Sequence, residues 1–248
     1  MSKVEYVYGI HPVIQILSSG RRQVWQLFVD KTRKGKQMEE LARIASKRGI
    51  GLTKVDGDEI TRLVPRDANH QGVVLKTEKM SVMSLADAID AEENPQNAVW
   101  LALDEVTDPQ NLGAILRSAA CLGVSTVVLP TRRTVGITAM VHKAACGALE
   151  HLRIAEVGNL NQAILQLRDK GFWIYGTDMG GTPLNKVSYA KPLLLVIGSE
   201  GTGIRQKTTE HCHEVLSIPQ KGGVESLNAA CACSIILYDI ASKTAKGK

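Results

Sequence analysis

The order of apolar and polar positions predicts alternating strands and helices along most of the chain. In the first part, residues 24–30 and 71–78 form short apolar runs typical of strands, and residues 37–49 have a helical period that ends at Gly49. From residue 98 the same patterns predict strands at 98–106, 124–130, 172–178, 192–200 and 213–219. They predict helices at 111–123 and 159–171, with Asn159 or Asn161 as the cap of the second, and a long helix of small residues near the C-terminus.

The apolar runs of the second part are continuous, which is typical of parallel strands that are buried on both faces. Strands that alternate with helices in this way predict an α/β fold with a parallel sheet. Residues 79–97 are acidic and include Pro95, and they predict a weak helix followed by a linker. We therefore expect a small α/β domain at 1–78, a linker at 79–97 and a larger domain at 98–248.

The charge balance is compatible with a polyanionic partner without requiring one. The formal net charge is +5 and the pI is about 8.9. The basic run at 30–36 is either a solvated loop or a phosphate contact, and the sequence does not decide between them. Only 4% of residues are aromatic, which argues against broad stacking platforms for nucleic-acid bases.

The remaining composition excludes several classes. The cysteines are five in number and lack framework spacing, which indicates a reducing compartment. The motif His211-Cys212-His213 cannot close a tetrahedral metal shell by itself, so no metal is expected. We expect no membrane span, because no apolar run reaches the roughly 20 residues required. The N-terminus has neither a signal-peptide core nor a transit-peptide composition.

Three loops at predicted strand ends carry unusual polar residues. In the first, Asp108-Pro109 makes a turn, Asn111 can cap the following helix, and Arg117 follows six residues later. The second is the Gly-Ser-Glu-Gly sequence at 198–201, and the third is the glycine pair before Ser226-Leu227-Asn228. Ligands of open α/β sheets bind beyond the carboxyl ends of strands. Each loop alone is weak evidence, since capped helices and glycine turns also occur without a ligand.

Taken in order, the segments NLGAILRSA, VIGSEGTGI and LSIPQKGGVESLNAACA resemble the three motifs of the SpoU/TrmH-type RNA 2′-O-ribose methyltransferases of the SPOUT superfamily. Within that superfamily the RlmB-like enzymes, which modify a guanosine of large-subunit rRNA, are the most similar group. The segments YGIHPV (8–13) and HQGVV (70–74) resemble the ends of the N-terminal RNA-binding domain found in many of these enzymes.

The resemblance implies a deep trefoil knot in the C-terminal part and S-adenosylmethionine as the cofactor. True knots are rare among folds. The resemblance assigns backbone contacts with the cofactor to Gly198, Ile218 and Leu227, and Thr177 is a further candidate. Glycines in the loops would let the backbone approach the adenosyl group closely.

The resemblance also implies the catalytic residues Asn111, Arg117, Glu200, Ser226 and Asn228. Arginine is protonated over the accessible pH range. We therefore expect Arg117 to bind a phosphate and stabilise the developing alkoxide, and we leave the proton acceptor open. Glu200 would orient Arg117 or the substrate, and Ser226 and Asn228 would position the loop, the ribose or a phosphate.

Family members form homodimers, so a homodimer that binds large-subunit rRNA is expected. The alternatives are the same reaction on tRNA, or an RNA-binding ribosome-assembly protein without activity. We expect a cytoplasmic location, with the mitochondrion as the alternative.

Overall fold

The computed structural model describes residues 4–199, 203–223 and 226–244, and the described chain divides into two compact units. Unit 1 contains the chain up to Ser81 together with 137–150. Unit 2 contains 82–136 and the chain from His151 onward. The predicted division into domains at 1–78 and 98–248, with a linker at 79–97, stays a prediction. The structure adds that residues 137–150 belong to the same compact unit as the N-terminal part of the chain.

Unit 1 is built on a mixed four-stranded sheet in the order β1-β4-β2-β3. Only β2 and β3 run parallel, while β4 is antiparallel to both β1 and β2. Helices α1 and α2 cover one face of this sheet, and α3 packs against the other. The elements are β1 (Val4–Tyr8), α1 (Ile10–Ser19), β2 (Val24–Asp30), α2 (Lys36–Lys47), β3 (Leu52–Val55), α3 (Gly57–Arg62), β4 (Val73–Glu78) and α6 (Ala139–Ala145).

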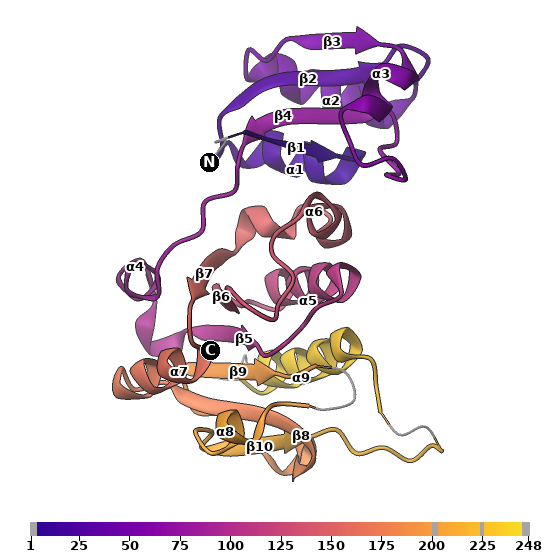
Figure 1. Cartoon of the computed structure of the whole chain (residues 1–248). Coiled ribbons are helices and arrows are strands. Elements are labelled where there is room, and N and C mark those ends of the chain that lie inside the picture. Colours follow the sequence, from indigo (N-terminus) through magenta and orange to yellow (C-terminus); the bar gives the residue numbers. More distant parts are fainter. Residues whose placement is uncertain (1–3, 200–202, 224–225, 245–248) are drawn as a thin grey trace. The chain divides into compact units, whose positions relative to one another are not determined.

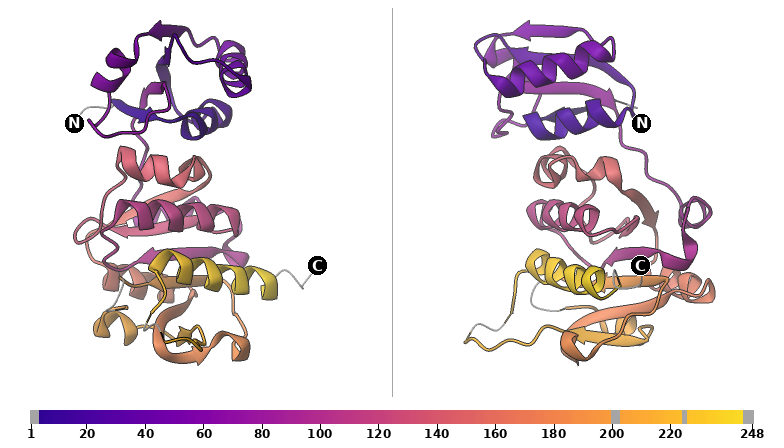
Figure 2. Two further views of the ribbon diagram at one scale, coloured as in Figure 1. Left: turned by 90° about the vertical axis from the view of Figure 1, so that its right-hand side faces the viewer. Right: turned by 180° about the vertical axis from the view of Figure 1, so that it is seen from behind.

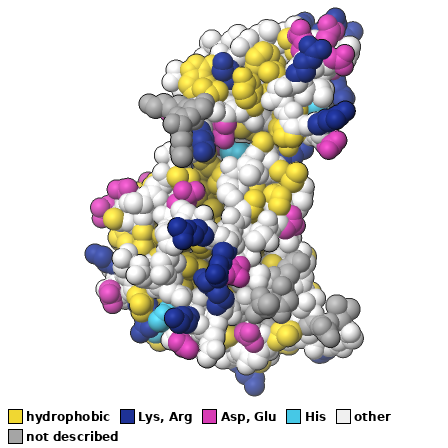
Figure 3. Space-filling model, viewed as in Figure 1, with side chains coloured by type: hydrophobic (Ala, Val, Ile, Leu, Met, Phe, Trp, Pro, Cys, Tyr) yellow, Lys and Arg dark blue, Asp and Glu magenta, His cyan; other side chains and the backbone are white. Residues whose placement is uncertain are grey.

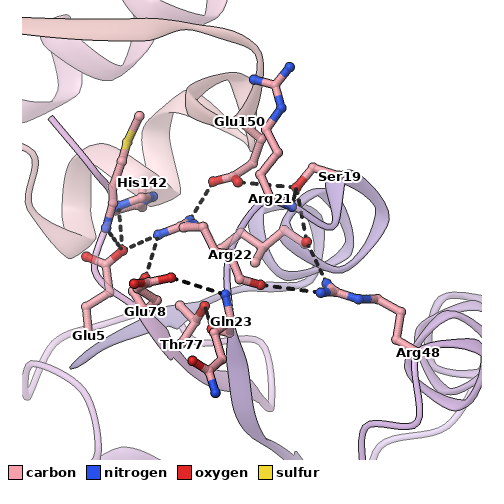
Figure 4. Close-up of polar contacts among 12 residues, drawn as sticks. Glu5, Ser19, Arg21, Arg22, Gln23, Arg48, Thr77, Glu78, His142 and Glu150 are labelled. Carbon is pink, nitrogen blue, oxygen red and sulfur yellow. Dashed lines mark hydrogen bonds and ion pairs between the residues drawn. The ribbon is translucent and has the colours of Figure 1, made fainter. Parts of the chain in front are cut away.

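A buried ionic cluster ties the segment 137–150 to the rest of unit 1. The Arg22 guanidinium pairs with the carboxylates of Glu5 and Glu150, at 2.5 Å from the latter, and lies between them in Figure 4. The Arg22 side chain is only 7% exposed and that of Glu150 only 3%. His142 of α6 lies 3.3 Å from the Glu5 carboxylate. Burial alone would raise the pKa of Glu5, but the bond with His142 and the charges of His142 and Arg22 lower it below the usual value.

Unit 2 contains a six-stranded sheet in the order β10-β8-β9-β5-β6-β7. All of its paired strands run parallel, which confirms the predicted α/β class. The central strands β5 and β9 are buried at every position, as their continuous apolar sequences predict. The strands are β5 (Val99–Leu103), β6 (Thr126–Pro130), β7 (Arg153–Val157), β8 (Trp173–Pro183), β9 (Leu193–Ile197) and β10 (Glu214–Ser217).

Helices cover both faces of this sheet, with α4 and α7 on one face and α5 and α9 on the other (Figures 1 and 2). Helix α5 packs directly against α9. The helices of unit 2 are α4 (Leu85–Asp90), α5 (Pro109–Cys121), α7 (Leu160–Asp169), α8 (Gln206–Thr209) and α9 (Ala229–Thr244). Because the knot depends on how loops pass one another and not on strand order, it stays a prediction.

Part of the region predicted as a linker packs firmly on unit 2. Ser84 caps α4, and Leu85 and Ala88 enter the core of that unit. The Glu92 carboxylate then accepts bonds from the Trp100 indole at 2.7 Å and from the Ser125 hydroxyl at 2.6 Å. Residues 84–92 are therefore structured as part of unit 2.

Two predictions about helix caps have different outcomes. Asn159 caps α7 by accepting a bond from the backbone of Gln162. Asn111 does not cap α5, because Asp108 takes that position and accepts from the backbone of Gln110 and Asn111. Pro109 occupies the first helical position, where its missing N–H costs nothing. The side chain of Asn111 is therefore available for another contact.

Candidate active site

Three loops follow the carboxyl ends of β5, β9 and β10 in the parallel sheet of unit 2. The first motif begins at Asn111 in the helix that follows the first loop, and the second and third motifs include the other two loops. Strands β5 and β9 are neighbours in the centre of the sheet, and parallel strands end at the same edge. The described parts of the three motifs therefore gather at one edge of the sheet, where open α/β proteins bind their ligands.

One hydrogen bond joins the first motif to the third across 117 residues of sequence. The side-chain amide nitrogen of Asn228 donates to the Asn111 side-chain oxygen at 2.8 Å. The oxygen of Asn228 accepts from the backbone of Ala230 at 2.9 Å and of Cys231 at 3.2 Å, so Asn228 also caps α9. Asn228 thus uses both ends of its amide to fix the start of α9 beside α5.

The same helix pair has a second polar contact further along. The hydroxyls of Ser118 and Ser234 lie 2.7 Å apart where α5 meets α9. Arg117 lies beside Ser118 on α5, and its side chain is exposed. Helix α5 therefore presents Asn111 and Arg117 from one rigid element. Glu200, which the sequence places in the same site, lies outside the described residues.

A cavity of about 150 Å³ lies beside the second and third loops. The four residues predicted to bind the cofactor all line it, and so does Ser226. Its other lining side chains are mostly apolar, which suits a flat heterocycle. The lining consists of Thr177, Asp178, Met179, Ile197, Gly198, Ser199, Gly203, Leu216, Ile218, Gln220, Ser226, Leu227, Ala229, Ala232 and Ile236.

The close approach at Gly198 is between two parts of the backbone. A Cβ on Gly198 would lie 2.0 Å from the carbonyl carbon of Gly203 and 2.3 Å from the amide nitrogen of Ile204. Ser199 and Gly203 exchange two backbone hydrogen bonds, at 3.1 and 3.2 Å, which hold the ends of this loop together. The sequence-based reason for a glycine here was space for the adenosyl group. The structure gives a different reason, since the loop closes on itself at this point.

We expect Gly198→Ala to destabilise the protein by about 1–3 kcal/mol, because the added methyl group overlaps backbone that cannot move independently. Gly222→Ala is the matched control, since a Cβ there meets no atom within 4 Å. Thermal unfolding with and without S-adenosylhomocysteine measures both effects. Equal melting temperatures for the two variants would contradict this account of the loop.

A buried carboxylate that sequence reasoning missed supports the second loop. Asp104, at the end of β5, is 1% exposed. It pairs with the Arg205 guanidinium at 2.8 Å and accepts from the Thr208 hydroxyl at 3.0 Å. Asp178, which lines the cavity, was also missed. Asp104 directly follows the apolar strand β5, and that position was the signal that could have identified it, whereas Asp178 lies within β8.

Two cysteines near these loops are not suited to act as nucleophiles. Burial raises the pKa of Cys212 to about 11 and that of Cys233 to about 12. Both thiols are therefore protonated near neutral pH, whereas a nucleophilic cysteine reacts as its thiolate. Within the described ranges, no group of three His, Cys, Asp or Glu side chains is placed to hold a metal ion. No described helix is both long and apolar enough to cross a membrane.

Two family models match the chain and together span most of it. Residues 98–238 match the SpoU rRNA Methylase family. Residues 6–83 match the model for RNA 2′-O ribose methyltransferase substrate binding.

Similar proteins occur in several bacteria. A 23S rRNA (guanosine-2′-O-)-methyltransferase RlmB of Coxiella burnetii is 36% identical over 97% of this chain and 96% of its own. An uncharacterized tRNA/rRNA methyltransferase of Synechocystis sp. is 38% identical, and the chain spans 62% of that protein. The structure of an AdoMet-bound rRNA methyltransferase from Sinorhizobium meliloti has a TM-score of 0.78 and 27% identity, over 98% of this chain and 88% of that one. The motif loops, the cavity beside them and these matches together lead to one conclusion: the chain belongs to the SpoU rRNA methylase family of RNA methyltransferases.

Proposed function

We propose that this protein transfers a methyl group from S-adenosylmethionine to the ribose 2′-oxygen of a guanosine in large-subunit rRNA. The observation that carries the proposal is the bond between Asn111 and Asn228. It brings the first and third motifs together next to a cavity lined by Ser226 and Leu227. Relatives that match over almost their whole length are named for this reaction on 23S rRNA.

The cavity fits the cofactor by the chemistry of its lining. Ile218, Leu227 and Ile236 offer apolar surface for an adenine ring, while the Asp178 carboxylate and the Thr177 hydroxyl offer polar groups for a ribose or a cation. We assign the cofactor contacts to Thr177, Gly198, Ile218 and Leu227. When bound, S-adenosylmethionine supplies an electrophilic methyl group on a sulfonium.

In the reaction the ribose oxygen gains a bond to the methyl carbon and loses its proton, while the bond from that carbon to sulfur breaks. Negative charge develops on the oxygen before the proton has left completely. A fixed cationic donor stabilises such charge, and Arg117 is the residue that we assign to this role. Its exposed side chain on α5 is accessible to an RNA strand.

The other assigned residues position groups around this reaction. Asn111 and Asn228 fix each other and the start of α9. Ser226, two residues before Asn228, lines the cavity, and its hydroxyl can donate a hydrogen bond to the ribose or to a phosphate. For Glu200, which lies outside the described residues, we propose the orientation of Arg117 or of the substrate.

We propose that unit 1 docks the RNA and that the enzyme is a homodimer. The match of residues 6–83 to a substrate-binding model supports the first role. In the basic segment 30–36, Lys31 pairs with Asp56 at 2.5 Å, and both side chains are more than half exposed. This exposed pair is compatible with a solvated loop and also with a loop that contacts a phosphate.

For the dimer, Ile235 and Tyr238 of α9 expose 41% and 67% of their surface, and this apolar surface is available for a second copy. We also propose a cytoplasmic location, which is supported by bacterial relatives named for a reaction on 23S rRNA.

The test is to map 2′-O-methyl groups in rRNA and tRNA from cells with and without the gene. We expect one guanosine of large-subunit rRNA to lose its methyl group, and the purified protein to restore it in vitro. A lost tRNA methyl group would support the tRNA alternative instead. If no methyl group is lost although S-adenosylhomocysteine binds in calorimetry, the result would support the alternative of an RNA-binding protein without activity.

A further inference from the structure

A second cavity, of about 240 Å³, lies beyond the carboxyl ends of β5, β6 and β7. It shares two loops with the candidate active site. Asp104 and Glu105 begin the loop that leads into α5, and Arg205 ends the described part of the loop after β9. In contrast to the first cavity, charged and amide side chains dominate its lining. The lining residues are Asp104, Glu105, Pro130, Arg132, Arg133, Gly158, Asn159, Leu160, Asn161 and Arg205.

Two of the three arginines in this cavity are held by carboxylates. Arg205 bonds to the buried Asp104 through Nη2 at 2.8 Å and through Nε at 3.2 Å, and this fixes the plane of its guanidinium. Arg133 pairs with Glu105 at 3.1 Å. Arg205 also lies 3.5 Å from Glu105. The two carboxylates therefore orient two guanidinium groups and offset their charge.

Because three arginines and two carboxylates line the cavity, Arg132 gives it a net positive charge. Within the described part of the chain, no carboxylate lies within ion-pairing distance of its guanidinium. The start of α7 also lines the cavity through Gly158, Asn159 and Leu160, and backbone N–H groups of a first helical turn favour an anion. A set of oriented and unpaired guanidinium groups is what binds phosphate with defined geometry.

Two residues that line the cavity have an uncommon backbone conformation. Glu105 has a φ of 63° and Arg133 a φ of 61°, in the left-handed region that residues other than glycine seldom adopt. Both residues line this cavity and pair with each other. Local strain of this kind clusters at binding sites, where the fold holds side chains in place for a ligand.

We infer that this cavity binds a backbone phosphate of the RNA close to the nucleotide that is methylated. The inference rests on the proposed function, because it takes RNA as the substrate. On the face drawn in Figure 3, Lys and Arg side chains lie in separate groups, several with Asp or Glu beside them. Phosphate binding on such a surface depends on local sites more than on one continuous band. The loops after β5 and β9 contribute Asp104, Glu105 and Arg205 to the lining, and the loop after β5 leads into the helix that carries Arg117. A phosphate bound here would hold the RNA strand on the side of unit 2 where these loops lie.

The test compares Arg132→Gln with Lys170→Gln in the full-length protein. Lys170 is an exposed residue at the opposite end of α7, so the control removes one positive charge from the same unit away from the cavity. The probe is an in vitro transcript of large-subunit rRNA, bound in the presence of S-adenosylhomocysteine at several salt concentrations. Calorimetry with S-adenosylhomocysteine alone and melting temperatures accompany each variant.

We expect Arg132→Gln to weaken RNA binding about tenfold or more, with unchanged cofactor affinity and melting temperature. The slope of log K against log salt should become shallower by about 0.7–0.9, as for the loss of one phosphate contact. In an ethylation-interference experiment, one phosphate near the methylated nucleotide should matter to the wild-type protein and not to Arg132→Gln. Lys170→Gln should behave like the wild-type protein in both experiments.

Three results would overturn the inference. These are unchanged affinity and slope in Arg132→Gln, weaker binding with an unchanged slope, or loss of cofactor affinity. The wild-type protein in the methylation assay separates this test from that of the proposed function. If it methylates rRNA while Arg132→Gln binds RNA normally, only the inference fails. If it methylates no RNA, the proposed function fails independently of the binding result.

Discussion

Replacing Arg117 by alanine is expected to slow methyl transfer by about 10²–10³-fold, with cofactor affinity almost unchanged. This is the loss typical when one donor to developing negative charge is removed. The cofactor affinity should survive because Arg117 lies on α5, whereas the first cavity is lined by residues of other elements. Single-turnover methylation and calorimetry with S-adenosylhomocysteine measure the two effects separately.

Arg117→Lys should also fail to restore the rate, because an ammonium group does not reproduce the planar fork of the guanidinium. Arg168→Ala on α7 is the control for losing an exposed arginine from unit 2. If Arg117 were only a solvated helix residue, its loss would change stability by no more than about 0.5 kcal/mol and leave turnover intact. Near-normal turnover in the alanine variant would remove Arg117 from the mechanism.

Replacing Arg22 by methionine is expected to destabilise unit 1 by about 3–5 kcal/mol. The change keeps most of the side-chain stem but leaves the buried Glu150 and the partly buried Glu5 without their shared cation. Urea unfolding reports the loss. Hydrogen exchange of peptides from residues 4–30 and 139–150 should show where it occurs.

The matched control is Lys31→Met, which removes the cation of an exposed pair with Asp56. Such a pair contributes about 0–1 kcal/mol. Adding Glu5→Gln and Glu150→Gln to Arg22→Met should recover much of the lost stability, because the uncompensated charges are then gone. A small effect of Arg22→Met, similar to that of Lys31→Met, would show that water reaches the cluster.

Local sequence patterns predicted most strands and helices of the second part of the chain, but not β7. β5 and β9 have sequences that are apolar at every position, and α7 begins at a cap that the sequence shows. Short elements with mixed patterns, such as β3 and α6, were not predicted, because so few residues carry too little periodicity. Their structure depends on tertiary contacts.

The residues of the candidate site were predicted from the order of the three motifs and their resemblance to a family, and local sequence patterns alone would not have identified them. No local pattern indicates that Asn228 would reach Asn111, because the partners are 117 residues apart. In the same way, the pairing of Asp104 with Arg205 requires that β5 and β9 be neighbours in the sheet, which the sequence does not state. The cap of α5 was misassigned because Asp108 and Asn111 are both good capping residues, and only the backbone decides which of them is used.

The grouping of residues 137–150 with unit 1 affects how the two parts of this chain can be exchanged. The chain passes between the units three times, between residues 81 and 82, 136 and 137, and 150 and 151. If a graft replaces only the first 81 residues, Glu150 and His142 come from the recipient. The graft must then supply Arg22 and Glu5, which pair with them. In such a graft, a donor without an arginine at position 22 would leave the buried Glu150 carboxylate without its cation. The two units can therefore be exchanged if residues 137–150 move together with the first 81 residues, or if the grafted segment keeps an arginine at position 22.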